Sequence, residues 1–298
     1  MQIIRTVREM QLSCRNLRRI GTLGLVPTMG ALHDGHLSLV RRARAECDGV
    51  AASIFVNPTQ FAAGEDYESY PRTFDDDCAK LRAAGVELLF APSSQEMYPA
   101  GSKTFVEVPG IGDRLDGGSR PGHFRGVATV VAKLFNIVGP DRAYFGQKDA
   151  AQIAVLRAMI RDLNSSVQLV ACPIVREPDG LAMSSRNRNL SAQNRQRALI
   201  LHRAMERVCE LLEEGETRSD VLQNALLEVF ATDDTIRLDY AAIVDPCTLL
   251  PVAATTHGAL IAVAAWVGTT RLIDNILTDN VLIENLHIDR GSMEEIHV

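Results

Sequence analysis

Residues 23–36 read Leu-Gly-Leu-Val-Pro-Thr-Met-Gly-Ala-Leu-His-Asp-Gly-His. The first four of these residues predict a buried strand, and a helical pattern begins near Leu37. A strand followed by a glycine-containing turn and a helix is a common phosphate-binding arrangement. The start of the helix offers free N–H groups and the positive end of the helix dipole. Gly30 and Gly35 allow the backbone to approach such a ligand closely.

Two histidines end this stretch and extend the argument toward a nucleotide. His33 and His36 lie in a His-x-Gly-His pattern, the kind found at the ATP site of nucleotidyl-transferring enzymes, and both can donate hydrogen bonds to one anion. The alternative is a tight turn with two solvated histidines. A metal pair is not expected, because the pattern lacks the glutamate of a His-Glu-x-x-His site and no third ligand is evident.

The composition of the 298-residue chain is that of an ordinary globular protein, with 46% apolar and 23% charged residues. Its net charge of −6 argues against a general nucleic-acid binder. The chain contains no run of about 18 apolar residues, so no membrane span is expected. The N-terminus lacks the apolar core of a signal peptide. The six scattered cysteines have no zinc-binding spacing and are expected to be reduced thiols. A cytoplasmic location follows as the expectation.

Strands that are apolar throughout alternate with helices over the first part of the chain, which predicts an α/β fold with a parallel sheet covered on both faces. The expected strands are 22–26, 50–56, 86–91, 104–108, 142–145 and 167–175. The expected helices are 7–17, 37–46, 74–84, 127–138 and 149–163. Ligands bind beyond the carboxyl ends of such strands, and polar clusters follow the strands 22–26, 50–56 and 142–145.

The pattern changes at about residue 176. A long amphipathic helix over 191–213, a second over 219–230 and strands near 236–244 and 258–267 predict a smaller α+β unit. The chain is therefore expected to contain a ligand-binding domain over 1–175, a smaller domain over 176–280 and a polar tail over 281–298.

The cluster after strand 50–56 reads Asn57-Pro58-Thr59-Gln60-Phe61. Asn57 and Gln60 each offer an uncharged donor and an acceptor, which suits a ligand that carries both hydroxyls and a carboxylate. The alternative is a plain polar turn.

The cluster after strand 142–145 runs from Phe145 to Gln152 and enters a helix. Lys148 can place a positive charge against phosphate, since a lysine in the first turn of a helix is poorly placed for the helix dipole. Gln152 lies one turn further on the same face. Asp149 can instead serve as a simple helix cap.

The segment Val175 to Asn187 joins the two halves. Within it Ser184, Ser185 and Arg186 suit the β- and γ-phosphates of a nucleotide, although a hinge linker with solvated charges is the alternative. Three acidic residues, Asp75 to Asp77, could contact Mg²⁺ through water or could simply begin a helix.

These segments together resemble the pantothenate synthetase family, over residues 1 to about 275. The residues that carry the resemblance are Pro27 to His36, Phe55 to Phe61, Asp66 with Tyr70 to Thr73, Met97 to Pro99, Arg120 to Gly126, Gly146 to Gln152 and Arg176 to Arg186. Asn-Pro-Thr-Gln-Phe and Met-Ser-Ser-Arg are the specific elements among them. The resemblance implies a Rossmann-like doubly wound sheet, a C-terminal lid domain and a cytoplasmic homodimer.

The implied reaction is the ATP-dependent condensation of pantoate with β-alanine to pantothenate, AMP and pyrophosphate through a pantoyl adenylate, with Mg²⁺ bridging the phosphates. The catalytic residues would be His33, His36 and Lys148, which would supply positive charge to the phosphates, and His36 would protonate the leaving pyrophosphate. The implied ATP contacts are Met29, Gly30, Ala31, Leu32, His33, Asp34, Gly35, His36, Gly146, Gln147, Lys148, Asp149, Val175, Met183, Ser184, Ser185 and Arg186. Pantoate would contact Gln60 and Gln152, and β-alanine would contact Asn57 and Gln60. Any metal contact through water would come from Asp76 or Asp77.

Two other functions fit parts of the pattern. A nucleotidylyltransferase that stops at an adenylated product would need no second acceptor site, so Asn57 and Gln60 argue against it. A non-catalytic nucleotide- or RNA-binding module is disfavoured by the acidic net charge and by Lys148. No nucleic acid or membrane partner is therefore expected.

Overall fold

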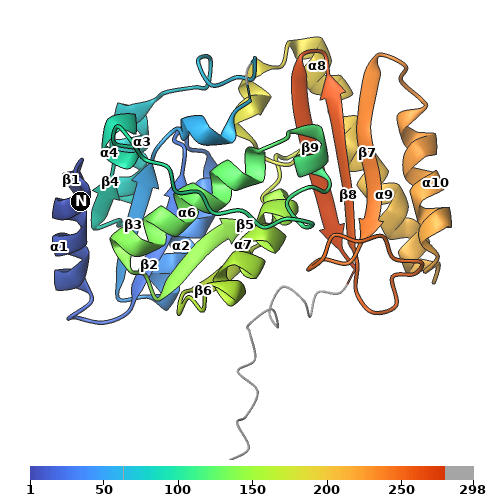
Figure 1. Cartoon of the computed structure of the whole chain (residues 1–298). Helices are drawn as coiled ribbons and strands as arrows, with labels where there is room; N and C mark the ends of the chain where they lie inside the picture. Colours follow the sequence, from blue (N-terminus) through green and yellow to red (C-terminus); the bar gives the residue numbers. More distant parts are fainter. Residues whose placement is uncertain (63, 279–298) are drawn as a thin grey trace, which may run out of the picture.

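The larger of two sheets contains six parallel strands in the order β1-β4-β3-β2-β5-β6 (Figure 1). The computed structural model describes residues 1–62 and 64–278. The strands are β1 (Gln2–Ile4), β2 (Leu23–Thr28), β3 (Gly49–Ile54), β4 (Leu88–Phe90), β5 (Arg142–Gly146) and β6 (Gln168–Cys172). This is the doubly wound α/β arrangement that the sequence predicts.

Helices cover both faces of this sheet, because successive strand residues point to opposite sides. Leu25 packs in a cluster with α1 (Val7–Leu17), α6 (His123–Val138) and α7 (Ala150–Asp162). Its neighbour Val26 packs in a second cluster with α2 (Asp34–Glu46) and α3 (Phe74–Ala83). Both faces are therefore apolar, as the unbroken apolar runs of the strands indicate.

The smaller sheet is antiparallel, in the order β7-β8-β9. Its strands are β7 (Ile236–Val244), β8 (Leu260–Val267) and β9 (Thr270–Leu277). The helices α9 (Leu199–Glu213) and α10 (Ser219–Phe230) pack in one cluster with it, whereas Leu260 and Ala262 of β8 join the core of the larger sheet. Figure 1 shows this sheet at the opposite end of the molecule from α1. The two sheets are thus connected through a shared apolar cluster.

Short helices carry most of the polar clusters. They are α4 (Ser94–Met97), α5 (Asp116–Ser119), α8 (Ala192–Arg197) and the 3₁₀-helices η1 (Pro58–Gln60), η2 (Gln147–Asp149) and η3 (Ser185–Asn189). η1 follows β3 and η2 follows β5, so both lie at the carboxyl edge of the parallel sheet. This edge is where open α/β sheets bind ligands.

The chain reverses its direction of winding between β2 and β5. β2 leads outward to β3 and β4, and the chain then returns to add β5 on the other side of β2. β2 pairs with β5 only at Gly24 and Leu25. The carbonyl of Leu23 accepts from Asp141, so odd-numbered residues of β2 face β5. Pro27 faces the same way and has no N–H to donate. The ladder cannot continue at Pro27, and the two strands separate at the switch point.

Several elements differ from the sequence prediction. Residues 104–108 form no strand, because Val106 bonds to the side chain of Thr129 instead of to a neighbouring strand. The helix expected over 191–213 is interrupted at Ala198, where Leu201 donates to a carbonyl three residues back. β1 is too short to show a pattern, and β9 was not expected.

The helices of the described ranges include none with the length and apolar character that a membrane crossing requires. The expected tail, 281–298, lies outside the described residues. The proposed boundary between residues 175 and 176 stays a prediction.

Candidate active site

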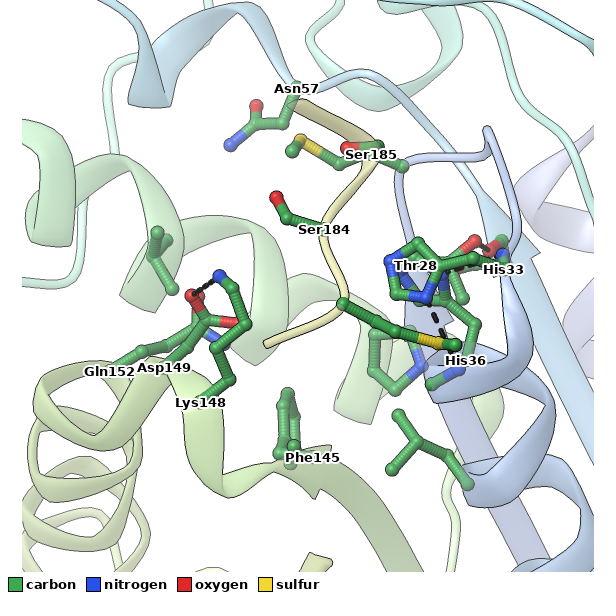
Figure 2. A pocket seen from close by; sticks show the side chains of 18 of the residues that line it. Thr28, His33, His36, Asn57, Phe145, Lys148, Asp149, Gln152, Ser184 and Ser185 are labelled. Carbon is green, nitrogen blue, oxygen red and sulfur yellow. Dashed lines mark hydrogen bonds and ion pairs between the residues drawn. The ribbon is translucent and has the colours of Figure 1, made fainter. Parts of the chain in front are cut away.

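A cavity of about 210 Å³ lies where β2 and β5 separate, and it opens into a cleft of about 740 Å³ toward the smaller sheet. The same five residues line both spaces: Lys148, Asp149, Gln152, Ser184 and Arg186. Figure 2 shows Lys148 and Gln152 on one side of the cavity and His33 and His36 on the other. The structure therefore brings together the polar clusters that are far apart in the sequence.

Most of the residues expected to contact ligands line the inner cavity. They are Met29, His33, Gly35, His36, Asn57, Gln60, Gly146, Lys148, Asp149, Gln152, Val175, Met183, Ser184, Ser185 and Arg186. Gly30, Ala31, Leu32, Asp34 and Gln147 are not among the lining residues.

The turn between β2 and α2 is held by a buried carboxylate. Gly30 and Ala31 have φ angles of 84° and 51°, and the left-handed region is unfavourable for alanine. Asp77 of α3 accepts hydrogen bonds from the N–H groups of Ala31 (2.9 Å) and Leu32 (2.8 Å). Thr73 donates its hydroxyl to the same carboxylate at 3.1 Å. These bonds compensate for the burial of Asp77, whose exposed fraction is 0%.

The expected contact of Asp76 or Asp77 with Mg²⁺ is wrong for Asp77, because both oxygens of its carboxylate bind this turn. Asp76 points to the surface and pairs with Lys80 at 2.7 Å. Lys80 also donates to the carbonyl of Leu32 at 2.9 Å. Among the described residues, no group of three or more Asp, Glu, His or Cys side chains could hold a metal ion.

His33 and His36 cap the start of α2 reciprocally. Nδ1 of His33 accepts from the N–H of Gly35 at 3.2 Å, and Nδ1 of His36 accepts from the N–H of His33 at 3.4 Å. A neutral imidazole that accepts at Nδ1 carries its proton on Nε2. Each ring can therefore donate one Nε2–H bond to a ligand.

Burial keeps both imidazoles uncharged. Desolvation, followed by the proximity of His33 and Lys148, lowers the pKa of His36 from 6.5 to about 3. Desolvation and Lys148 lower the pKa of His33 to about 4. The expectation that both histidines supply positive charge therefore needs correction, because at pH 7 the fold itself favours the neutral form. The expected protonation of pyrophosphate by His36 stays a prediction, because the opposite charge of a bound triphosphate would raise this pKa.

Lys148 brings a positive charge to the inner cavity, which Arg186 also lines. It lies in η2, directly after β5, and its Nζ is 3.6 Å from Oδ1 of Asp149. Asp149 occupies the N-cap position of α7 but makes no capping hydrogen bond, so the alternative of a simple helix cap does not hold. Its half-exposed carboxylate points toward Lys148 (Figure 2).

Asn57 is a supporting residue in this structure. Its Nδ2 donates to Oε1 of Gln60 at 3.0 Å and to the carbonyl of Gly126 at 3.2 Å. Its Oδ1 accepts from Thr59 at 2.9 Å and from Tyr98 at 2.8 Å. The expected contact of Asn57 with β-alanine is therefore not favoured, because its amide already has protein partners.

The amide of Gln60 is available to a ligand by comparison. Asn57 orients its oxygen, while its Nε2 lies 3.2 Å from the sulfur of Met29, which is a weak acceptor. Gln152 lines the same cavity from α7. The two amides can therefore hold one polar ligand from different elements.

Two ion pairs connect the loops around the outer cleft. Arg186 makes two bonds to Asp66, at 2.8 and 3.0 Å. Arg120 makes two bonds to Glu65, at 2.7 and 2.6 Å. The expected anion contact of Arg186 would thus compete with a carboxylate.

The roles of Glu65 and Asp77 were not predicted from the sequence. Asp77 alone had a usable signal: it lies three residues after Phe74 and four before Leu81, on the inward face of its helix.

Comparison with known proteins agrees with the geometry. A family model described as pantoate-beta-alanine ligase matches residues 2–277. A pantothenate synthetase of Koribacter versatilis is 56% identical over 278 residues, which cover 93% of this chain and 96% of the relative.

Solved structures agree as well. Pantothenate synthetase from Thermus thermophilus has a TM-score of 0.89 and 49% identity, over 93% of this chain and 99% of that one. The Francisella tularensis pantoate-beta-alanine ligase, solved as a complex with beta-gamma ATP and beta-alanine, has a TM-score of 0.74 and 33% identity. That match covers 93% of this chain and 98% of the neighbour.

Asp77→Asn should destabilise the protein, since an amide cannot accept from two N–H groups through both of its ends. A stranded buried donor costs about 1–3 kcal/mol. Asp76→Asn is the matched control, and loss of its exposed pair with Lys80 should cost about 0.5 kcal/mol or less. Urea unfolding measures both, and equal losses would contradict the assigned role of Asp77.

The buried histidines should make stability depend on pH. Below pH 6.5 unfolded His36 binds a proton that the folded form excludes down to about pH 3. The free energy of unfolding should therefore fall with decreasing pH, by up to about 1.4 kcal/mol per pH unit for one histidine. In His36→Asn, which keeps an acceptor for the N–H of His33, this slope should be smaller. Identical slopes in urea unfolding between about pH 7 and 4.5 would refute the assignment.

Proposed function

Because the chain belongs to the pantoate–β-alanine ligase family, we propose that it joins pantoate to β-alanine with ATP, through an enzyme-bound pantoyl adenylate. The products are pantothenate, AMP and pyrophosphate. The observation that carries this proposal is the cavity at the switch point, where Lys148 faces His33 and His36. The amides of Gln60 and Gln152 complete the same space.

In the first step a pantoate carboxylate oxygen attacks the α-phosphorus of ATP. The new oxygen–phosphorus bond replaces the bond to pyrophosphate, which leaves with its electron pair. The carboxylate is ionised at neutral pH, so this step needs no general base. Lys148 neutralises the developing charge, and the Nε2–H groups of His33 and His36 donate to phosphate oxygens.

In the second step the free amine of β-alanine attacks the acyl carbon of the adenylate. The carbon–nitrogen bond forms as the acyl–phosphate bond breaks, AMP leaves with the electron pair of that bond, and the nitrogen loses its proton to water. The mixed anhydride is already activated, so holding both reactants in place supplies most of what this step requires. Gln60 and Gln152 hold the pantoyl group in both steps, and Asn57 acts by orienting Gln60.

The loops around the cleft protect the adenylate from water. The pair between Arg186 and Asp66 connects η3 to the segment after η1, and Ser185 bonds to Tyr70 at 3.1 Å. Tyr70, Ser185 and Arg186 line the cavity, and Arg186 also lines the cleft into which it opens. A covered site slows hydrolysis of a reactive intermediate.

Mg²⁺ fits this site as a companion of ATP. Apart from Asp149, the carboxylates that line the cleft pair with arginines: Glu65 with Arg120, Asp66 with Arg186, and Asp116 and Asp239 with Arg271. Asp149 pairs instead with Lys148, at the longer distance of 3.6 Å, and it would be the carboxylate to contact the hydrated ion. The ion would neutralise phosphate charge when bound.

Further features of the proposal rest on the family. The resemblance implies a homodimer in the cytoplasm. It also implies a domain of residues 1–175 and a smaller domain of residues 176–280 that acts as a lid. Arg271 of the smaller sheet pairs with Asp116 of α5 at 2.6 Å, so the two units are in contact in this conformation.

The two-step scheme predicts that pyrophosphate exchanges into ATP with pantoate present and β-alanine absent. Nothing in the proposed triphosphate contacts involves the amine, so the first step should run alone. The exchange should require Mg²⁺. A strict requirement for β-alanine would favour a concerted reaction instead.

Lys148→Ala is the matched variant for this assay. Loss of one preorganised charge contact in the transition state should lower exchange by about 10²–10³-fold. The circular dichroism spectrum should not change, because Lys148 faces the cavity. Near-normal exchange would remove Lys148 from the mechanism.

Gln60→Ala tests the pantoate contact. A hydrogen bond to a charged group contributes about 1.5–3 kcal/mol, so the KM for pantoate should rise about 10–100-fold. The KM for ATP should change little. Gln223→Ala, on α10 and outside the cavity, is the control and should leave both values unchanged. If only the ATP value rises in Gln60→Ala, the pantoate assignment is wrong.

A further inference from the structure

The last strand of the smaller sheet contacts the turn that carries Lys148. Asn275 of β9 is buried, with an exposed fraction of 3%. Its Nδ2 donates to the carbonyl of Gln147 at 3.1 Å and to the carbonyl of Lys148 at 2.9 Å. Its Oδ1 accepts from Nε2 of Gln147 at 3.3 Å. One side chain thus binds η2 at three points.

These bonds supply donors to main-chain carbonyls of η2 from outside the helix. No side-chain cap is made by Gly146 at the start of η2 or by Asp149 at the start of α7. Buried main-chain polar groups need partners, so the amide of Asn275 stabilises this main-chain conformation. The direction in which Lys148 leaves the backbone follows from it.

Asn275 is itself held firmly. Its neighbour Asp274, 1% exposed, makes two bonds to Arg176, at 2.6 and 3.0 Å. The N–H of Asn275 donates to the same carboxylate at 2.8 Å. Arg176 begins the segment that leads to Ser184 and Arg186. The strand β9, the segment that begins at Arg176 and the helix η2 are therefore joined by one set of polar contacts.

We propose that Asn275 is a positioning residue for Lys148, through which the smaller sheet sets the location of the cavity's positive charge. The inference deepens the proposed function, because the role of Lys148 in catalysis rests on it. The substitution Asn275→Asp keeps the shape of the side chain but removes the side-chain N–H groups that donate to the two carbonyls. The charge of the new carboxylate would also face two carbonyl oxygens.

The first measurement needs neither ligand nor activity. The chain contains four lysines, Lys80, Lys103, Lys133 and Lys148. In a spectrum of protein labelled with ¹⁵N-lysine, Lys148→Arg identifies the amide resonance of Lys148. Asn275→Asp should shift or broaden this resonance and leave those of Lys103 and Lys133 in place.

The second measurement is a double-mutant cycle in the pyrophosphate-exchange assay. Asn275→Asp should lower kcat by about 10–100-fold, as a displacement of about 1 Å can, with little change in the KM for pantoate. In the Lys148→Ala background the same substitution should have almost no further effect, because groups that act as a unit are non-additive.

Leu226→Ala is the control for a merely structural effect. Leu226 is buried in the core of α10 and the smaller sheet. Its loss should lower the thermal midpoint at least as much as Asn275→Asp does, without moving the Lys148 resonance or kcat. If Asn275→Asp fails to fold, Asn275→Ser, which keeps one hydroxyl donor, enters the same measurements with the same expected directions.

The two proposals fail in different ways. If Asn275→Asp displaces the Lys148 resonance but the wild-type protein shows no pyrophosphate exchange, the proposed function is rejected and the positioning role is kept. An unmoved Lys148 resonance, or a full loss of kcat repeated in the Lys148→Ala background, would overturn the role of Asn275 and leave the proposed function intact.

Discussion

The buried carboxylate of Asp77 is the contact on which the rest of the site depends. It compensates for the left-handed conformations of Gly30 and Ala31 by accepting from Ala31 and Leu32. With the turn fixed, α2 can begin at Asp34, and the two histidines can cap it. The cost of burying a charge is thus offset by hydrogen bonds that shape a binding surface. An acidic side chain beside a nucleotide site serves here as a support for the backbone.

The site combines one ammonium group with two neutral donors. Burial keeps His33 and His36 uncharged, so the cavity avoids strong repulsion between cations when no anion is present. An arriving triphosphate would raise the pKa of both rings by opposite charge. The same groups can therefore respond to the ligand, whereas Arg120 and Arg186 are already paired with carboxylates around the cleft.

The α/β class and the parallel sheet could be predicted because fully buried strands are apolar throughout. The gathering of the polar clusters at one edge followed from the rule for open sheets.

Other features depend on contacts that the spacing of residues in the sequence does not encode. Asp76 and Asp77 are adjacent and chemically equal, and only packing of α3 separates a surface pair from a buried support. Residues 104–108 have the composition of a strand, but Val106 at their centre bonds to the side chain of Thr129. The charge state of His36 depends on desolvation by the finished fold, and Asn275 lies 127 residues from Lys148.

The distance along the chain between Lys148 and Asn275 has a consequence for the synthesis of the protein itself. A ribosome releases β5 and η2 long before β9, and domains generally fold in the order in which they emerge. A nascent chain that already contains all six strands of the larger sheet still lacks the amide that holds the carbonyls of Gln147 and Lys148. Nucleotide chemistry therefore awaits the last strand. A chain terminated upstream of Asn275 would contain the residues of all six parallel strands and both histidines, but its Lys148 turn would lack the hydrogen bonds from Asn275.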